Sequence, residues 1–363
     1  MSSRIPVTGI GVIAPGAIGV DAFRTLLASG GTAVADIDRF DTAGLTAHKA
    51  ALVLDFKPKE FIPVMKMRRM NALSRLGVSA AKLAIDDCGA APGQNTGVAL
   101  GTAFGPVQTS VDYMREYVEK GAALAPPQLF AESVANAPGS HIAIEWNLRG
   151  FNVTVTQRES SALAAAMYAA SQLMKGTADA ALIGGVEEAN EMLFSVLDRI
   201  GALSDEARPF AADRNGMVLG EGGAVMVAGA GTRTPYGWLS GFGMARDTTA
   251  SVSDWGHDPN AVVAAMKAAM RDADVDEVDA VYASANGSKR GDELEARALE
   301  AMFGGSRPEI VVTKQIFGEY AAGGALQLVA ALLGVEKGFR NVLVNSISAG
   351  GGIVCTVISR EDA

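Results

Sequence analysis

The side chains able to perform nucleophilic or acid–base chemistry are few and widely scattered in this sequence. The chain has two cysteines and three histidines: Cys88, Cys355, His48, His141 and His257. Thiolate catalysis needs a cysteine that an imidazole or another group activates within one site. No short segment of the sequence brings a cysteine and a histidine together, and Cys88 is interpreted as a small core residue at the end of a helical pattern.

Polar and charged side chains gather instead at the ends of three strand-like runs, in residues 155–162, 283–288 and 313–319. The residues of interest there are two carboxylates, an amide and an ammonium group: Glu159, Glu319, Asn286 and Lys314. None of them supplies a thiolate or an imidazole that titrates near neutral pH. We expect Lys314 to form a structural ion pair with Glu319 or with Glu159, and we expect no metal and no cofactor.

Strand-like and helical patterns that can position these segments alternate in two successive series. In the first series, strands are predicted over 5–13, 96–101 and 178–184, and helices over 20–29, 67–87 and 160–175. In the second, strands are predicted over 237–244, 278–283, 309–313, 341–346 and 353–358, and helices over 260–272, 292–303 and 322–333. The Gly- and Pro-containing stretch 229–235 separates the series, and residues 121–127 are the expected long loop. This alternation predicts two α/β halves, residues 1–230 and 231–363, with parallel strands covered by helices.

Composition narrows the classes of function. A formal charge of −9 argues against nucleic-acid binding, which needs a basic surface. The one basic cluster, residues 66–69, is interpreted as a solvated helix start or turn, with a docking spot for an acidic partner as the alternative. Two distant cysteines, no secretory signal and no long apolar run are typical of a soluble cytoplasmic protein.

One long string identifies a family resemblance. Residues 208–222 read Arg-Pro-Phe-Ala-Ala-Asp-Arg-Asn-Gly-Met-Val-Leu-Gly-Glu-Gly, and they resemble a string found in the ketosynthases of fatty acid and polyketide synthesis. Residues 7–12, 39–41, 178–187 and 313–314 extend the resemblance over essentially the whole chain. The resemblance implies a thiolase-like fold, in which two duplicated α/β halves form five layers in the order αβαβα.

The same resemblance shows that the family's nucleophile is missing. Ketosynthases hold a cysteine at a strand-to-helix turn, where the helix dipole and the backbone amides favour the thiolate. Counting back from residues 176–179, which match the end of the family's helix, places that position on Glu159. We expect Glu159 to act as a helix-capping acid, with Arg158 pairing with it or with a carboxylate of another subunit.

Both family histidines are missing as well. These imidazoles drive decarboxylation and stabilise the enolate, and by resemblance their positions correspond to Asn286 and Glu319. Lys314 keeps the family's lysine, whereas the phenylalanine that gates the C-terminal turn is absent from residues 346–352.

These losses favour a chain-length factor, the inactive ketosynthase homologue of type II polyketide synthases, with a polyene or aryl polyene system as the preferred type. Such a subunit of a β-ketoacyl synthase complex, inactive alone, pairs with an active ketosynthase as a heterodimer and shapes the far end of the acyl tunnel. Acyl carrier protein is then bound mainly by the partner. The alternatives are a malonyl-acyl-carrier-protein decarboxylase, whose relatives keep both histidines, and a non-enzymatic scaffold.

The resemblance also implies which surfaces would serve a partner. The family's dimer strand corresponds to residues 151–156, in which Phe151, Val153 and Val155 alternate with polar residues. The family's tunnel segment corresponds to residues 102–130. Its bulky residues at helical spacing are either core residues or candidate tunnel gates: Val111, Tyr113, Met114 and Tyr117.

Overall fold

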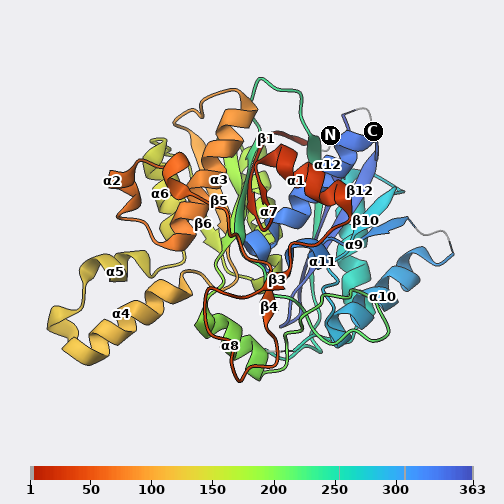
Figure 1. The fold of residues 1–363 in the computed structure, drawn as a ribbon. Coiled ribbons are helices and arrows are strands. Elements are labelled where there is room, and N and C mark those ends of the chain that lie inside the picture. The colour runs from red at the N-terminus through yellow and green to blue at the C-terminus, as the bar shows by residue number, and fades with distance from the viewer. Residues whose placement is uncertain (1–3, 253, 306–307, 362–363) are drawn as a thin grey trace.

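The computed structural model describes residues 4–252, 254–305 and 308–361, which form two series of strands with helices between them (Figure 1). The first series is β1 (Ile5–Ala14), β5 (Thr96–Gly101), β6 (Asn152–Val155), β7 (Ala180–Glu187) and β8 (Gly222–Ala228). The second is β9 (Gly237–Arg246), β10 (Ala280–Tyr282), β11 (Glu309–Val311), β12 (Asn341–Ile347) and β13 (Gly352–Ser359). The two-residue strands are β2 (Ala17–Ile18), β3 (Ala35–Asp36) and β4 (Lys49–Ala50).

The two series have the same topology. The strand order is β6-β5-β7-β8-β1 in the first and β11-β10-β12-β13-β9 in the second. In both, the first three strands of that order pair in parallel and the remaining pairings are antiparallel. Numbered within its own series, each order reads 3-2-4-5-1. One α/β unit is therefore present twice.

Backbone hydrogen bonds join the two units into one sheet of eleven strands, counting β2. The join is short, because β1 pairs with β9 only from Ile5 to Val7. The sequence predicted one sheet for each half and missed this join. Its physical origin is the connection from β8 to β9, which is held beside the start of β1 by hydrogen bonds from Gly229 N to Pro6 O and from Tyr236 N to Val7 O.

Helices cover the outer faces of both units and fill the space between them (Figure 1). On the outside, α3 (Ala72–Cys88) packs on β1 and β8, and α9 (Pro259–Ala273) packs on β9 and β13. Between the units lie α7 (Ser161–Met174) and α12 (Ala325–Lys337), and α12 contacts strands of both. The main hydrophobic cluster accordingly combines residues of both units around these two helices. The five-layered αβαβα arrangement predicted from the sequence is confirmed.

Glycines at matching places allow each outer helix to lie close to its sheet. A Cβ atom on Gly11 of β1 would lie 1.9 Å from the carbonyl oxygen of Ala80 in α3. A Cβ atom on Gly243 of β9 would lie 2.0 Å from the carbonyl oxygen of Ala265 in α9. Both distances are far below van der Waals contact, so both strands need glycine where the helix backbone crosses them.

Most predicted elements end within a few residues of the observed bounds. The helix predicted over 67–87 begins only at Ala72, because the Asn71 side chain accepts a hydrogen bond from Ser74 N and caps α3 there. The loop predicted over 121–127 is wrong in part, since Ala122–Leu124 form a 3₁₀ turn. The remaining helices are α1 (Val20–Ser29), α2 (Val64–Met67), α4 (Val107–Lys120), α5 (Pro127–Glu132), α6 (Ala137–Glu145), α8 (Glu191–Arg199), α10 (Lys289–Phe303) and α11 (Lys314–Phe317). Among the described residues, none of these helices has the length and apolar character that crossing a bilayer requires.

Helices α4 and α5 extend away from the body and form an arm, residues 107–132 (Figure 1). The ring of Tyr113 packs against those of Tyr117 and Phe130, with centroid distances of 6.3 and 5.5 Å. The contact of Tyr113 with Phe130 joins the two helices of the arm. Much of their apolar surface nevertheless faces solvent, because Tyr117, Met114 and Phe130 are 42%, 52% and 57% exposed.

Candidate functional site

Glu159 lies in a sharp turn between β6 and α7. The preceding residue, Arg158, has a φ of 47°, and residues Arg158–Ser160 form a 3₁₀ turn that leads into α7. The Glu159 side chain is buried, and both carboxylate oxygens are bound. Tyr320 Oη donates to its Oε1 at 2.8 Å, and the Ala349 backbone N–H donates to its Oε2 at 3.2 Å. The carboxylate therefore binds groups of the second unit, and no ion pair joins it to Arg158 within the described chain.

Glu319 accepts hydrogen bonds from three directions in the turn that follows α11. Lys314 Nζ and Asn286 Nδ2 each lie 2.7 Å from its Oε2, and the Tyr320 N–H lies 2.9 Å from its Oε1. Lys314 Nζ also donates to the carbonyl oxygen of Ser284 at 2.8 Å. Of the two partners expected for Lys314, Glu319 is the one it binds.

Tyr320 links the two carboxylates into one network, and the sequence analysis missed it. Its hydroxyl binds Glu159, its backbone N–H binds Glu319, and its φ of 66° turns the side chain back toward α7. Burial, then the negative charges of Glu159 and Glu319, raise the pKa of Tyr320 well above its ordinary value. The hydroxyl thus stays protonated and serves as the donor to Glu159.

The network fills the space that surrounds it. The void beside Asn286, lined also by Trp255, Ser284 and Ile347, has no room for a water molecule. Glu159, Asn286, Lys314 and Glu319, the four residues singled out in the sequence, are all at most 2% exposed. The structure brings them into one region as hydrogen-bonded side chains.

Glu159 should make the stability of the fold depend on pH. Burial, and next the charge of Glu319, raise its pKa from 4.5 to about 7. An acid whose pKa is raised by folding destabilises the native state as it ionises, so the penalty is absent below about pH 4.5 and is complete above about pH 7. We expect Glu159→Gln to gain stability over the parent as the pH rises from 4.5 to 8, by roughly 3 kcal/mol at most.

The measurement is the free energy of urea unfolding of both proteins across that range. In the variant, the amide oxygen can accept from Ala349 N while its NH₂ donates to Tyr320 Oη, so the hydrogen bonds are retained. Other buried acids, such as Glu187 and Glu295, titrate in both proteins and cancel in the difference. Parallel curves for parent and variant would contradict the assignment.

The cysteines and histidines lie elsewhere in the fold. Cys88 ends α3 in the core, and Cys355 lies in β13, where burial raises the pKa of its thiol. His141 binds Glu132 at the base of the arm at 2.8 Å, and the other two histidines are exposed. Within the described residues, no cluster of His, Cys, Asp or Glu side chains is arranged to hold a metal ion.

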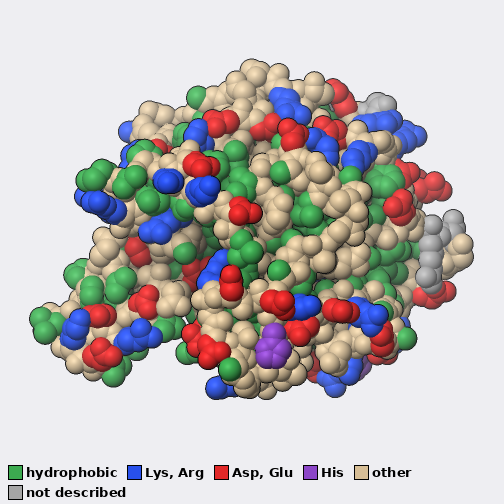
Figure 2. Space-filling view, viewed as in Figure 1, with side chains coloured by type: hydrophobic (Ala, Val, Ile, Leu, Met, Phe, Trp, Pro, Cys, Tyr) green, Lys and Arg blue, Asp and Glu red, His purple; other side chains and the backbone are tan. Residues whose placement is uncertain are grey.

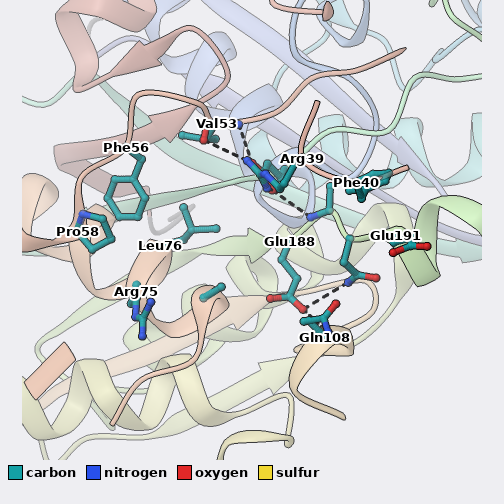
Figure 3. A pocket seen from close by; sticks show the side chains of 14 residues that line it. Arg39, Phe40, Val53, Phe56, Pro58, Arg75, Leu76, Gln108, Glu188 and Glu191 are labelled. Atoms are coloured by element: carbon teal, nitrogen blue, oxygen red, sulfur yellow. Dashed lines mark hydrogen bonds and ion pairs between the residues drawn. The ribbon is translucent and has the colours of Figure 1, made fainter. Parts of the chain in front are cut away.

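A cavity of about 420 Å³ opens at the foot of α4 (Figure 3). On one wall, Arg39 binds Glu221 through two hydrogen bonds of 2.7 and 2.8 Å, and Glu221 also accepts from the Val53 N–H. On another, Glu188 accepts from the N–H of Gln108 in the first turn of α4 at 2.8 Å. Burial, followed by the negative charge of Glu221, raises the pKa of Glu188 to about 7. Glu188 thus ties α4 to the body, and the Arg39 guanidinium is bound to Glu221.

The predicted partner-facing residues lie on α4 and at β6 of the first unit, and they range from half-buried to exposed. The candidate gates Val111, Tyr113, Met114 and Tyr117 all lie on α4, and interpreting them as ordinary core residues is wrong for Met114 and Tyr117 because both are exposed. The predicted strand is β6, which pairs with β5 alone among the described strands and so leaves one edge free. The side chains of Phe151, Val153 and Val155 pack against the main core cluster.

The basic cluster predicted from the sequence lies on α2 and just after it. Lys and Arg side chains gather over this helix on the face shown in Figure 2. Lys66, Arg68 and Arg69 are exposed, and Lys66 binds Glu145 of α6 at 2.8 Å. The cluster is therefore partly neutralised by the body itself.

Comparison with known proteins decides the family. Residues 2–231 match the β-ketoacyl synthase N-terminal domain, and residues 236–346 match the β-ketoacyl synthase C-terminal domain. The chain belongs to the β-ketoacyl synthase family. It is 28% identical to 3-oxoacyl-[acyl-carrier-protein] synthase 2 of Vibrio cholerae over 354 residues, which cover 91% of this chain and 85% of that protein.

Polyketide synthases are also among the relatives of this β-ketoacyl synthase homologue. It is 29% identical to the tetracenomycin polyketide synthase ketoacyl synthase beta subunit of Streptomyces glaucescens, over 93% of this chain and 86% of that one. The structure of the ishigamide ketosynthase/chain length factor superimposes with a TM-score of 0.91 at 24% identity, covering 99% of both chains. That similarity confirms the thiolase-like fold.

Proposed function

We propose that this β-ketoacyl synthase homologue is a non-catalytic subunit of the chain-length-factor type. The observation that carries the proposal is the state of Glu159 at the start of α7. A ketosynthase needs an accessible thiolate there, whereas this chain has a buried carboxylate with both oxygens hydrogen-bonded. Acyl transfer to a carboxylate would form a mixed anhydride in place of a stable thioester.

The residues at the two histidine positions support the same conclusion. Asn286 and Glu319 bind each other, and Lys314 neutralises Glu319. A carboxylate at this place opposes the negative charge that develops on an enolate, and the site has no imidazole to donate to it. The absence of free volume beside Asn286 also argues against decarboxylation of a malonyl group at this centre.

An active ketosynthase is the partner that this chain would serve, with acyl carrier protein bound mainly by that partner. Two relatives support the pairing through their names, one as a ketoacyl synthase beta subunit and one as a ketosynthase/chain length factor. The free edge of β6 and the exposed apolar arm are surfaces suited to such a partner. The complex would extend polyketide or polyene chains, with this subunit shaping the far end of the acyl tunnel.

The first test is whether the isolated chain lacks catalytic activity. The purified chain is incubated with acyl- and malonyl-acyl carrier protein, and intact mass and carbon dioxide release are measured. We expect no acyl adduct and no decarboxylation above background, because the matched positions supply neither thiolate nor imidazole. The control Glu159→Cys should remain inactive in condensation, since Asn286 and Glu319 are unchanged. An acyl adduct on Glu159 would overturn the proposal.

Product length in the reconstituted complex tests the role of the arm. Tyr117 is half-exposed on α4, and its removal by Tyr117→Ala should lengthen the products by one or more two-carbon units if its ring closes the tunnel. Tyr113→Ala and Met114→Ala are tested in parallel, and Val118→Ala on the same helix is the matched control. If all of these variants form the complex and give the parental length distribution, none of the three residues is the gate.

A further inference from the structure

A larger cavity, of about 680 Å³, lies at the far edge of the second unit. It is enclosed by α1, by β11 with the residues that follow it, and by the C-terminal half of α12. Apolar side chains form most of its wall: Leu27, Val311, Ile316, Ala330, Leu333 and Phe339. Glu159, Asn286, Lys314 and Glu319 do not line it, and neither does any residue of the arm or of β6. The cavity is therefore separate from the surfaces discussed above.

One hydroxyl group that reaches this cavity has no hydrogen-bond partner among the described residues. Tyr282 of β10 is 5% exposed, and its Oη binds no group of the described chain. Thr313 also lines the cavity, but its Oγ1 is enclosed by protein atoms and does not face the free space. Buried polar groups are almost always hydrogen-bonded in native proteins. The Tyr282 hydroxyl therefore needs an acceptor from within the cavity.

The chemistry of the lining defines the ligand. Burial, and next the negative charge of Glu309, raise the pKa of Tyr282 to about 12, so its hydroxyl stays protonated and can donate. Glu309 and Lys337, the two charged residues of the lining, are exposed at its rim and opposite in sign. An ion would gain no buried counter-charge there. An uncharged molecule with one acceptor oxygen matches both the apolar walls and the Tyr282 hydroxyl, which is free to donate.

We infer that this cavity binds a small, uncharged, largely apolar molecule whose carbonyl or ether oxygen accepts a hydrogen bond from Tyr282. The site is independent of the proposed role with a ketosynthase, because no part of it belongs to the degenerate centre or to the partner-facing surfaces.

A pair of matched probes tests the inference on the full-length chain. Acetophenone and ethylbenzene share a phenyl ring and a two-carbon substituent, but only acetophenone has an acceptor oxygen. Titrations followed by saturation-transfer NMR should show saturable binding of both, with acetophenone the tighter. Tyr282→Phe should weaken acetophenone by about three- to tenfold and leave ethylbenzene within about twofold, because it removes one hydrogen bond and little volume.

A filling variant locates the binding. Leu27 is half-buried on α1 and lines the cavity, so Leu27→Trp should weaken both probes severalfold or more. The neighbouring Leu26 is equally half-buried but does not line the cavity, and Leu26→Trp is the matched control. Circular dichroism confirms that the variants are folded. The inference is overturned if neither probe binds saturably, if Leu27→Trp and Leu26→Trp behave alike, or if Tyr282→Phe weakens both probes equally.

Discussion

Replacing Lys314 by methionine should cost the fold about 3–5 kcal/mol of unfolding free energy. The Lys314 ammonium group is buried and binds Glu319 Oε2 and the Ser284 carbonyl oxygen. Lys314→Met would leave the Glu319 carboxylate buried without a counter-charge, close to a second carboxylate on Glu159. The loss of one partner from a buried ion pair is costly because the remaining charge can be neither hydrated nor compensated.

The double variant Lys314→Met/Glu319→Gln separates this explanation from simple loss of packing. It removes both charges, so we expect it to recover much of the lost stability in urea unfolding. The exposed pair Lys82–Asp86 on α3 provides the matched control, and Lys82→Met should cost less than about 1 kcal/mol. If Lys314→Met is no more destabilising than Lys82→Met, the buried network does not stabilise the fold in the way proposed.

A structural role for Lys314 would explain why this chain retains a lysine that by resemblance belongs to a catalytic site. In the structure, Lys314 neutralises an acid at a position where the family has a histidine, and Asn286 completes that acid's hydrogen bonds. These side chains satisfy one another's hydrogen bonds. Such a network can stabilise the centre between the two units.

Much of the fold could be predicted because its elements have strong local signals. The bounds of α1 and β5 are those expected, since apolar spacing and flanking glycines mark them clearly. Strand β8 was missed because Gly222 and Gly223 begin it and read as part of a turn-rich string. The arm was missed as a structure of its own, because its apolar residues repeat at the spacing of a core-facing helix.

The candidate site was predictable in its residue types but not in its contacts. The resemblance located Glu159 and Glu319, yet Tyr320 reaches Glu159 across 161 positions of the chain. That contact depends on the positive φ of Tyr320 and on packing between the two units, and neither leaves a local signal in the sequence. The sequence could not decide between Glu319 and Glu159 as the partner of Lys314 for the same reason. The fold brings both carboxylates into one region, and only the folded structure shows which of them Lys314 binds.

The free edge of β6 should be essential for the proposed heterodimer. In this parallel pairing, Val98 N donates to Phe151 O and Thr102 N donates to Val155 O. Because backbone groups alternate in direction along a strand, the N–H of Thr154 points away from β5, toward the open edge. A partner strand that extends the sheet across a pseudo-two-fold axis would need this donor.

Thr154→Pro should therefore weaken the complex with an active ketosynthase by roughly 100-fold or more, while the isolated chain keeps its melting temperature within a few degrees. Proline removes the outward N–H and places its ring where a neighbouring strand would lie, but it leaves the bonds to β5 intact. Thr154→Val, which retains the N–H and removes only a hydroxyl without a partner, is the matched control and should bind like the parent. Co-purification and analytical ultracentrifugation report the complex, and circular dichroism reports the fold. Parental binding by a folded Thr154→Pro chain would show that β6 is not paired, and the arm would then have to supply the interface without it.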